Sequence, residues 1–192
     1  ERLLEKGGMS PGDKLILTKP LGTGTLFAAD MRRKAKGVWI EAAIESMLVS
    51  NRAAADIVHR HEATACTDVT GFGLLGHLVE MLNASNAAAE IDFDQIPALA
   101  GAVETIRAGL LSSLHPDNLR LRRAITNAET AAQNENLPLL FDPQTSGGLL
   151  VSVPPASAPD CLSALQSEGY GNARIIGDVS AQNDHVQRVT IR

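Results

Sequence analysis

The stretch ACTDVTGFGLLGH, residues 65–77, holds the residue types in this sequence that are best suited to phosphate chemistry. Its glycines, Gly71, Gly73 and Gly76, spell G-x-G-x-x-G, a pattern typical of turns that bind a dinucleotide pyrophosphate through backbone N–H groups. Asp68 lies just before them, and a carboxylate beside a phosphate-binding turn repels the phosphate unless a cation neutralises it. The stretch therefore raises two alternatives, a metal-free dinucleotide site and a metal-bridged phosphate site.

The residues that flank Asp68 favour the metal-bridged site. Magnesium is commonly held by one or two carboxylates together with substrate phosphates, and Thr67 and Thr70 offer hydroxyls that could orient Asp68 or a bound water. We therefore predict Asp68 as a magnesium ligand, with Thr67, Thr70 and Gly71 close to the phosphates of a nucleotide. An aspartate that only caps the following turn is the structural alternative.

The dinucleotide alternative keeps some support. A strand pattern precedes the glycines, a helix pattern follows them, and Asp92 lies 21 positions after Gly71, near where a ribose-binding acid would stand. Against it, a strand and a long helical stretch come first, whereas a dinucleotide-binding unit usually opens its domain. A third interpretation gives the glycines a packing role only.

A second candidate anion site lies where a strand over 14–22 meets a helix over 23–35. Gly22, Thr23 and Gly24 place small residues and a hydroxyl at the start of the helix, where free backbone N–H groups favour anions. Lys19 could complement phosphate charge there, or it could be a solvated lysine beside a turn.

The segment DPQTSGG, residues 142–148, is a third candidate. Glycines and hydroxyl residues in one loop can form an anion-binding concavity from successive backbone N–H groups, and a tight turn into a buried strand is the alternative. The residues that we predict near the phosphates are Asp142, Gln144, Thr145, Ser146, Gly147 and Gly148.

The cysteines and histidines have little chemical context. Cys66 and Cys161 lie far apart without a C-x-x-C motif, which predicts neither a disulfide framework nor a zinc site and fits a reducing cytoplasm. We expect Cys66 to be a small buried hydrophobe. His59 and His61 do not share a helix face, so we expect solvated polar residues, whereas His77 follows the glycines and could touch a phosphate.

Composition and pattern predict one layered domain. The chain is 44% hydrophobic, which suits a packed core, and its net charge of −5, with 3% aromatic residues, argues against a nucleic-acid partner. No apolar run reaches the length of a membrane span. Strand patterns alternate with helix patterns, which favours an α+β or α/β fold with about five or six strands in a mixed sheet. The expected strands are 14–22, 63–69, 88–93, 149–154, 173–181 and 186–191, the last two paired; the expected helices are 23–35, 38–59 with a break near residues 51–52, one after the glycines, 98–108, 119–134 and 156–169.

Four segments together resemble selenophosphate synthetase (selenide, water dikinase). They are LTKPLGTGTLFAADMR, ACTDVTGFGLLGHLVEM, SSLHPDN and DPQTSGGLLVSVP, in that enzyme's order from residue 17 to 154. The resemblance covers nearly the whole chain and implies the C-terminal domain of a two-domain enzyme in the aminoimidazole ribonucleotide synthetase-like superfamily, with residues 1–13 as the end of an interdomain segment.

The implied reaction converts ATP, selenide and water into selenophosphate, AMP and phosphate. The resemblance implies Asp68 as the magnesium ligand of this domain, the segment from Lys19 to Gly24 as part of the nucleotide cleft, and the loop at 142–148 as the second signature. The catalytic Cys or selenocysteine belongs to an N-terminal domain that this sequence lacks, so we expect no catalytic residue and no turnover here, and a homodimer in the full-length enzyme. Another superfamily member, such as a purine-synthesis ligase or a small-molecule kinase, and a non-catalytic nucleotide-binding or docking domain remain alternatives.

Overall fold

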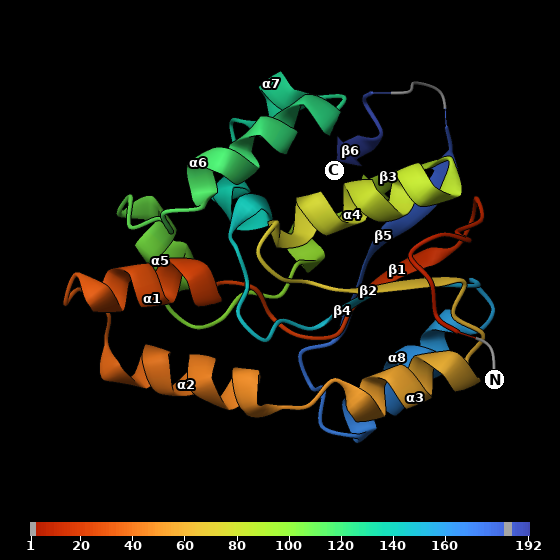
Figure 1. Cartoon of the computed structure of the whole chain (residues 1–192), viewed down its shortest axis with the longest axis horizontal. Coiled ribbons are helices and arrows are strands. Elements are labelled where there is room, and N and C mark those ends of the chain that lie inside the picture. Colours follow the sequence, from red (N-terminus) through yellow and green to blue (C-terminus); the bar gives the residue numbers. More distant parts are fainter. Residues whose placement is uncertain (1–2, 183–185) are drawn as a thin grey trace.

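A mixed sheet forms the centre of the molecule (Figure 1). The computed structural model describes residues 3–182 and 186–192, and within them six strands pair in the order β2-β4-β1-β5-β3-β6. Neighbouring strands are antiparallel except β3 and β6, which are parallel. The strands are β1 (Lys14–Leu17), β2 (Ala65–Asp68), β3 (Ala87–Ile91), β4 (Leu149–Val153), β5 (Arg174–Ala181) and β6 (Val189–Ile191).

Helices and short 3-10 turns connect these strands. The α-helices are α1 (Thr23–Met31), α2 (Gly37–Leu48), α3 (Arg52–Arg60), α4 (Gly73–Ser85), α5 (Ala102–Arg107), α6 (His115–Asn118), α7 (Ala128–Ala131) and α8 (Ala158–Ser167). The 3-10 turns are η1 (Phe93–Gln95), η2 (Leu119–Ala124) and η3 (Leu137–Phe141). In the described part of the chain, no helix combines the length and the apolar character that crossing a membrane requires.

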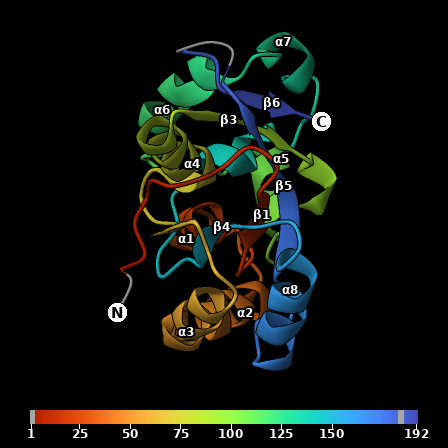
Figure 2. The same ribbon diagram turned by 90° about the vertical axis from the view of Figure 1, so that its right-hand side faces the viewer.

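Alternation along β1 divides the core between the two faces of the sheet. Leu15 and Leu17 join the main cluster with the apolar side of α4, whereas Ile16 points into a second cluster with α3 and α8. Successive strand residues face opposite sides of a sheet, so a central strand with buried apolar side chains on both faces supports helices on both sides. Figure 2 shows α4 and the α3–α8 pair in separate layers around the strands.

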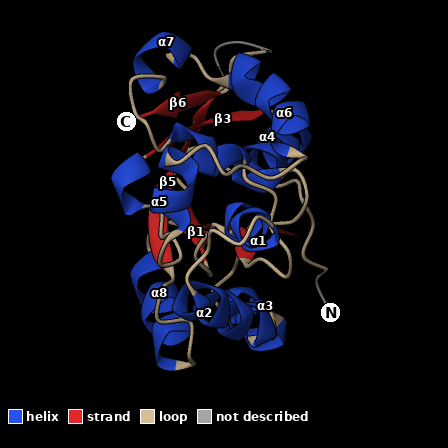
Figure 3. Cartoon of the chain, turned by 90° about the vertical axis from the view of Figure 1, so that its left-hand side faces the viewer, coloured by secondary structure: helices blue, strands red, loops and turns tan. Residues whose placement is uncertain are grey.

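A third group of helices extends beyond the sheet. Helices α1, α2 and α5 gather on the left of Figure 1 and in the foreground of Figure 3. They share a small core of Leu26, Ala43, Leu99 and Ala102. This group brings the start of α1 against the end of the sheet where β2 and β4 are neighbours.

The predicted α+β layered fold with a mixed sheet is confirmed, and so is the break in the long helix after α2. The helix expected over 119–134 was wrong, because η2 and α7 occupy only parts of it. Asn127 lies between them and bonds both the N–H and the carbonyl of Ile191, at 3.0 and 2.7 Å. These bonds hold the segment against β6 rather than in a continuous helix.

The expected pairing of the last two strands was also wrong. Strand β5 lies between β1 and β3, and β6 adds to the far edge of β3 in parallel register. Alternating apolar residues identify a strand but not its neighbour. The strand expected over 14–22 ends at Leu17, after which Leu21 forms an isolated bridge with Ala98.

Residues 3–13 run along the sheet edge before β1. The carbonyl of Glu5 accepts from the Cys66 N–H at 2.8 Å, and the N–H groups of Gly8 and Met9 donate to the Ser85 hydroxyl at 3.1 Å. This segment thereby covers β2 and the end of α4. The first two residues of the predicted interdomain segment, 1–13, lie outside the described residues, and its interdomain role stays a prediction.

Candidate phosphate and metal site

The two glycine-containing loops lie side by side. Strands β2 and β4 are antiparallel neighbours with Asp68 opposite Leu149, so the chain that leaves β2 meets the chain that enters β4. Val69 N–H donates to the Gly148 carbonyl at 2.8 Å, and Gln144 N–H donates to the Thr70 carbonyl at 3.0 Å. The antiparallel pairing thus brings together residues 67–71 and 142–148, which are far apart in the sequence.

The start of α1 joins this site, but its N–H groups already have protein acceptors. Gly22 and Thr23 donate to the side-chain oxygen of Gln144 at 3.0 and 3.3 Å, and Gly24 donates to an Asp142 carboxylate oxygen at 3.1 Å. The carboxylate and amide therefore act as caps for the helix from a distant loop. Side-chain oxygens of the protein therefore occupy the anion-binding site that we expected at residues 22–24.

The two carboxylate oxygens of the buried Asp142 differ in their hydrogen bonds. One oxygen accepts from Gly24 and from the Gln144 amide, at 3.1 and 2.9 Å, whereas the other has no hydrogen-bond partner among the described residues. Burial raises the pKa of Asp142 to about 7, and the bonds from Gln144, Gly24 and Thr25 oppose that rise. This group titrates near neutral pH.

The loop Thr145–Gly148 contains three consecutive backbone N–H groups without a protein acceptor, whereas the Thr145 N–H donates to the Thr23 hydroxyl at 2.9 Å. Ser146 adopts a left-handed φ of 49°, and a Cβ on Gly147 would lie 2.1 Å from the Val69 carbonyl oxygen. Close backbone approach therefore requires glycine at that position. Among the described residues, the N–H groups of Ser146, Gly147 and Gly148 donate to no protein acceptor. Ser146 is exposed, whereas Gly147 and Gly148 are buried. Successive N–H groups without a protein acceptor are of the kind that can form an anion-binding concavity.

The loop carbonyls, by contrast, are taken. Ser146 O accepts from the Lys19 ammonium at 3.1 Å, and Gly147 O accepts from the Asn51 side-chain amide at 2.9 Å. Thr145 and Ser146 side chains are exposed. The loop thus bonds the protein through these carbonyls and through the Thr145 N–H, and the N–H groups of Ser146, Gly147 and Gly148 keep no acceptor among the described residues.

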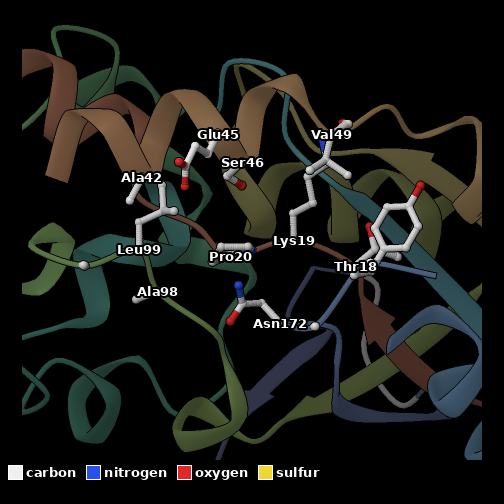
Figure 4. A pocket seen from close by; sticks show the side chains of 14 residues that line it. Thr18, Lys19, Pro20, Ala42, Glu45, Ser46, Val49, Ala98, Leu99 and Asn172 are labelled. Carbon is white, nitrogen blue, oxygen red and sulfur yellow. Dashed lines mark hydrogen bonds between the residues drawn. The ribbon is translucent and has the colours of Figure 1, made fainter. Parts of the chain in front are cut away.

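Lys19 is buried rather than solvated, so that alternative was wrong. Only 4% of the residue is exposed, and its ammonium donates to the carbonyls of Val49 and Ser146. Burial lowers its pKa. Figure 4 shows the side chain extending toward Val49, at the rim of a pocket of about 360 Å³ that Glu45 of α2 and Asn172 also line.

Asp68 ends β2 with an exposed side chain. The Thr67 hydroxyl donates to the Asp68 backbone carbonyl at 3.3 Å, and the Thr70 hydroxyl pairs with His77 Nε2 at 3.1 Å, so neither hydroxyl orients the Asp68 carboxylate. No group of three or more His, Cys, Asp or Glu able to hold a metal occurs in the described part of the chain. Asp68 suits a single oxygen ligand of a magnesium ion whose other ligands lie elsewhere.

A pocket of about 600 Å³ adjoins the open loop. Its walls mix apolar side chains of α1 and α2 with polar residues of the candidate site, a combination typical of small-molecule sites. The lining includes Thr23, Gly24, Phe27, Met31, Met47, Gly71, Leu114, Gln144 and Thr145.

The topology contradicts the dinucleotide alternative. Among the described residues, strand β2 is an edge strand that pairs with β4 alone, in antiparallel orientation. Strand β3, which precedes Asp92, lies near the opposite edge of the sheet, beside β6. A dinucleotide-binding unit requires parallel β-strands around its glycine turn. The glycines have local roles instead: Gly73 has a left-handed φ of 69° at the start of α4, and a Cβ on Gly76 would lie 2.6 Å from Cβ of Phe72.

Two asparagines in this site, Asn118 and Asn51, were not predicted as site residues from the sequence. Asn118 is buried and donates to the carbonyls of Gly71 and Phe141, at 2.8 and 3.0 Å. Asn51 holds Gly147, as described above. Asn118 lies inside the segment SSLHPDN, and Asn51 lies at the predicted helix break. The sequence therefore marked both positions as places where a helix is interrupted, but it did not indicate that their side chains would hold loop carbonyls.

The surroundings of the cysteine and histidine side chains near the site indicate structural rather than catalytic roles. Burial, together with the negative charge of Asp68, raises the pKa of the half-buried Cys66 to about 12, which keeps it a thiol. His61 is half-buried and its Nδ1 lies 2.9 Å from the Ile57 carbonyl, whereas His59 is exposed, as expected. Burial lowers the pKa of His77, whose Nε2 pairs with the Thr70 hydroxyl.

The sequence matches the family model described as AIR synthase related protein, C-terminal domain, over residues 10–189. The chain belongs to this family. As an AIR synthase related C-terminal domain, it is 39% identical over 187 residues to a selenide, water dikinase of Bdellovibrio bacteriovorus and 40% identical over 187 residues to one of Geobacter metallireducens. Each match covers 96% of this chain and 53% of the relative, so the chain spans about half the length of these curated relatives.

Solved structures share this domain's fold. Hydrogenase maturation protein HypE in complex with ATP matches with a TM-score of 0.70 and 15% identity, covering 98% of this chain and 49% of HypE. A thiamine-monophosphate kinase from Stenotrophomonas maltophilia matches with a TM-score of 0.63 and 18% identity, covering 98% of this chain and 52% of the kinase. These likenesses establish the fold of the AIR synthase related C-terminal domain for this chain.

Proposed function

We propose that this chain is the ATP- and magnesium-binding C-terminal half of a selenophosphate synthetase, which makes selenophosphate, AMP and phosphate from ATP, selenide and water. The observation that carries the proposal is the open N–H loop at Ser146–Gly148 beside the exposed carboxylate of Asp68. Loop N–H groups bind phosphate oxygens, and a carboxylate next to them suits a phosphate-bound cation. The identity to curated selenide, water dikinases supports this choice of reaction.

In this proposal the chain contributes binding and orientation. Asp68 supplies one oxygen ligand to magnesium, which when bound neutralises phosphate charge. The N–H groups of the open loop hold phosphate oxygens, and Thr145 and Ser146 add exposed hydroxyls at the same loop. The pocket between α1, α2 and Leu114 is apolar enough to hold a flat ring next to this polar edge.

The rest of the enzyme completes the reaction. We propose that the catalytic Cys or selenocysteine and further metal ligands lie in an N-terminal domain, a proposal supported by the chain's coverage of only 53% of each selenide, water dikinase that it matches. The chain alone is then inactive. The full-length enzyme is a cytoplasmic homodimer in this proposal, and its partners are ATP and selenide rather than nucleic acid or membrane.

Replacement of Asp68 tests the proposal in the whole protein that contains this chain. Asp68→Asn removes the charge that binds magnesium but keeps the shape, and we expect selenide-dependent AMP formation to fall roughly a hundredfold or more. Asp92→Asn is the matched control, because Asp92 follows β3 at the other end of the sheet. We expect it to retain activity.

Other outcomes separate the alternatives. An Asp68→Asn protein with unchanged activity would refute the metal assignment. ADP rather than AMP as product would indicate a small-molecule kinase or ligase on the same fold, which the thiamine-monophosphate kinase likeness makes the second candidate. Binding of ATP without any turnover in the whole protein would indicate a nucleotide-binding or docking domain.

A further inference from the structure

Lys19 and Asn51 approach the open loop from the side of its carbonyls. The Lys19 ammonium lies 3.1 Å from Ser146 O, and the Asn51 amide nitrogen lies 2.9 Å from Gly147 O. Lys19 follows β1, whereas Asn51 lies in the link between α2 and α3. Two separate elements therefore contact two consecutive peptide groups of one loop.

Peptide geometry places the N–H groups on the opposite side. No cis peptide bond occurs among the described residues, and a trans peptide points its C=O and N–H in opposite directions. The carbonyl of Ser146 shares a peptide group with the N–H of Gly147, and the carbonyl of Gly147 shares one with the N–H of Gly148. Donors that fix these carbonyls from behind therefore aim both N–H groups away from Lys19 and Asn51.

The same bonds strengthen the N–H groups as donors. A hydrogen bond to a carbonyl polarises the whole peptide group, and a charged donor polarises it more. Lys19 is 4% exposed and forms no ion pair with an acidic side chain of the described chain. No described carboxylate lies within ion-pair distance of its ammonium, so an anion on the far side of the loop would gain from the positive charge.

The Asn51 amide is oriented to donate to the loop, and this orientation leaves its side-chain oxygen without a hydrogen bond in the described part of the chain. Its side-chain oxygen is buried and has no partner among the described residues. Turning the amide over would place that oxygen against the Gly147 carbonyl, so only the observed orientation serves the loop. Nearby, the Tyr170 hydroxyl donates to Ser50 O at 2.6 Å and accepts from Ala54 N–H at 2.9 Å, which fixes the link that carries Asn51.

We propose that Lys19 and Asn51 are positioning residues that orient and polarise the Gly147 and Gly148 peptides for a polyphosphate group, without touching that group themselves. This role deepens the proposed function and rests on it for the identity of the nucleotide. It differs from the expectation that Lys19 contacts phosphate directly.

Amide NMR of the ¹⁵N-labelled chain titrated with sodium tripolyphosphate tests the proposal without magnesium, selenide or turnover. We expect tripolyphosphate to shift the Gly147 and Gly148 amide signals of the parent chain. Lys19→Met and Asn51→Ala should each weaken binding roughly tenfold, because each removes one polarising bond. In the free chain, Lys19→Met should move mainly the Gly147 amide proton upfield and Asn51→Ala mainly that of Gly148.

Matched controls separate positioning from charge and folding. Lys14→Met removes the same charge from β1, where Lys14 pairs with Asp178 instead. Asn127→Ala removes an asparagine that bonds the Ile191 backbone far from the loop. Both should bind tripolyphosphate as the parent does, and Lys19→Arg should restore most of the affinity lost in Lys19→Met.

Equal affinities in the parent, Lys19→Met and Asn51→Ala would overturn the proposal. So would an absence of any Gly147 or Gly148 shift in the parent. If tripolyphosphate binds as expected but the whole protein forms no selenide-dependent AMP, the proposed function fails and the positioning role stands. If AMP forms while the variants bind normally, the positioning role alone fails.

Discussion

Asp142 shows how one carboxyl group can cap a helix without remaining ionised at every pH. Its bonded oxygen accepts from Gly24 at the start of α1, yet burial raises its pKa to about 7. The same oxygen receives the Gln144 amide, so the group is shared between two segments that are far apart in the sequence. Protonation of this one residue is therefore coupled to the junction between α1 and the signature loop.

The stability of the chain should depend on pH through Asp142. A folded-state pKa above the unfolded value of about 4 means that the folded state binds the proton more tightly, so this contribution is fully present at low pH and is lost as pH rises to the folded pKa of about 7. We expect the free energy of unfolding to fall between about pH 4 and 7, by up to about 4 kcal/mol. Urea unfolding at several pH values measures this.

Asp142→Asn is the control for that pH dependence. Its oxygen can accept from Gly24 and Gln144, while its NH₂ replaces the oxygen that has no partner. The variant should lose the decline attributed to Asp142. Identical pH profiles for the parent and the Asp142→Asn variant would show that the carboxyl does not titrate in this range.

At the scale of elements, the G-x-G-x-x-G pattern is divided among distinct tasks. Gly73 provides the left-handed turn at the start of α4, and Gly76 lets Phe72 pack against the helix. A Cβ on Gly71 would meet nothing within 4 Å, and no left-handed φ requires glycine there. One motif thus contains two structural glycines and one position that folding leaves free.

Alanine substitutions should separate these tasks. Gly73→Ala introduces strain at a left-handed φ and a contact 2.9 Å from the Leu140 carbonyl, so we expect a loss of about 2 kcal/mol or more in stability. Gly71→Ala should change stability by less than about 1 kcal/mol. Thermal or urea unfolding of both variants makes the comparison, and equal losses would contradict it.

Gly71→Ala has a second use because Gly71 was predicted near the phosphates. A variant that folds normally but binds Mg-ATP more weakly in the whole protein would place Gly71 at the ligand. Unchanged binding would restrict the site to the loop at 145–148 and its neighbours.

At the scale of the whole molecule, β1 connects the layers. It lies between β4 and β5, its Leu15 and Leu17 belong to the main core, and its Ile16 belongs to the cluster with α3 and α8. Lys19 follows within two residues of its end. The strand that unites the two cores therefore also carries the residue behind the open loop.

Shortening a buried side chain of β1 should destabilise the whole fold. Leu15 is fully buried, and Leu15→Ala should cost about 2–5 kcal/mol by leaving a cavity in the main core. Leu3→Ala is the control, because Leu3 is 80% exposed and its loss should stay within about 0.5 kcal/mol. Denaturant unfolding followed by circular dichroism tests both, and a small loss at Leu15 would contradict the central role of β1.

The sequence by itself determined the kind of fold, most element positions and the segments that form the candidate site. Periodicity identified the apolar side of α4 and the break before α3, and residue types identified Asp68 and the loop at 142–148, because local spacing and side-chain chemistry are written in the sequence. The partner of each strand is not written in the local sequence, and so the predicted pairing of the last two strands was wrong.

Only the tertiary structure decided which polar groups remain open. The N–H groups of residues 22–24 looked as available as those of 146–148 in the sequence, but Gln144 and Asp142 occupy the first set and leave the second free. Lys19 likewise turned from a solvated or phosphate-binding side chain into one that holds a loop carbonyl. Hydrogen-bond partners depend on which distant segments the sheet brings together, and that information appears only once the chain is folded.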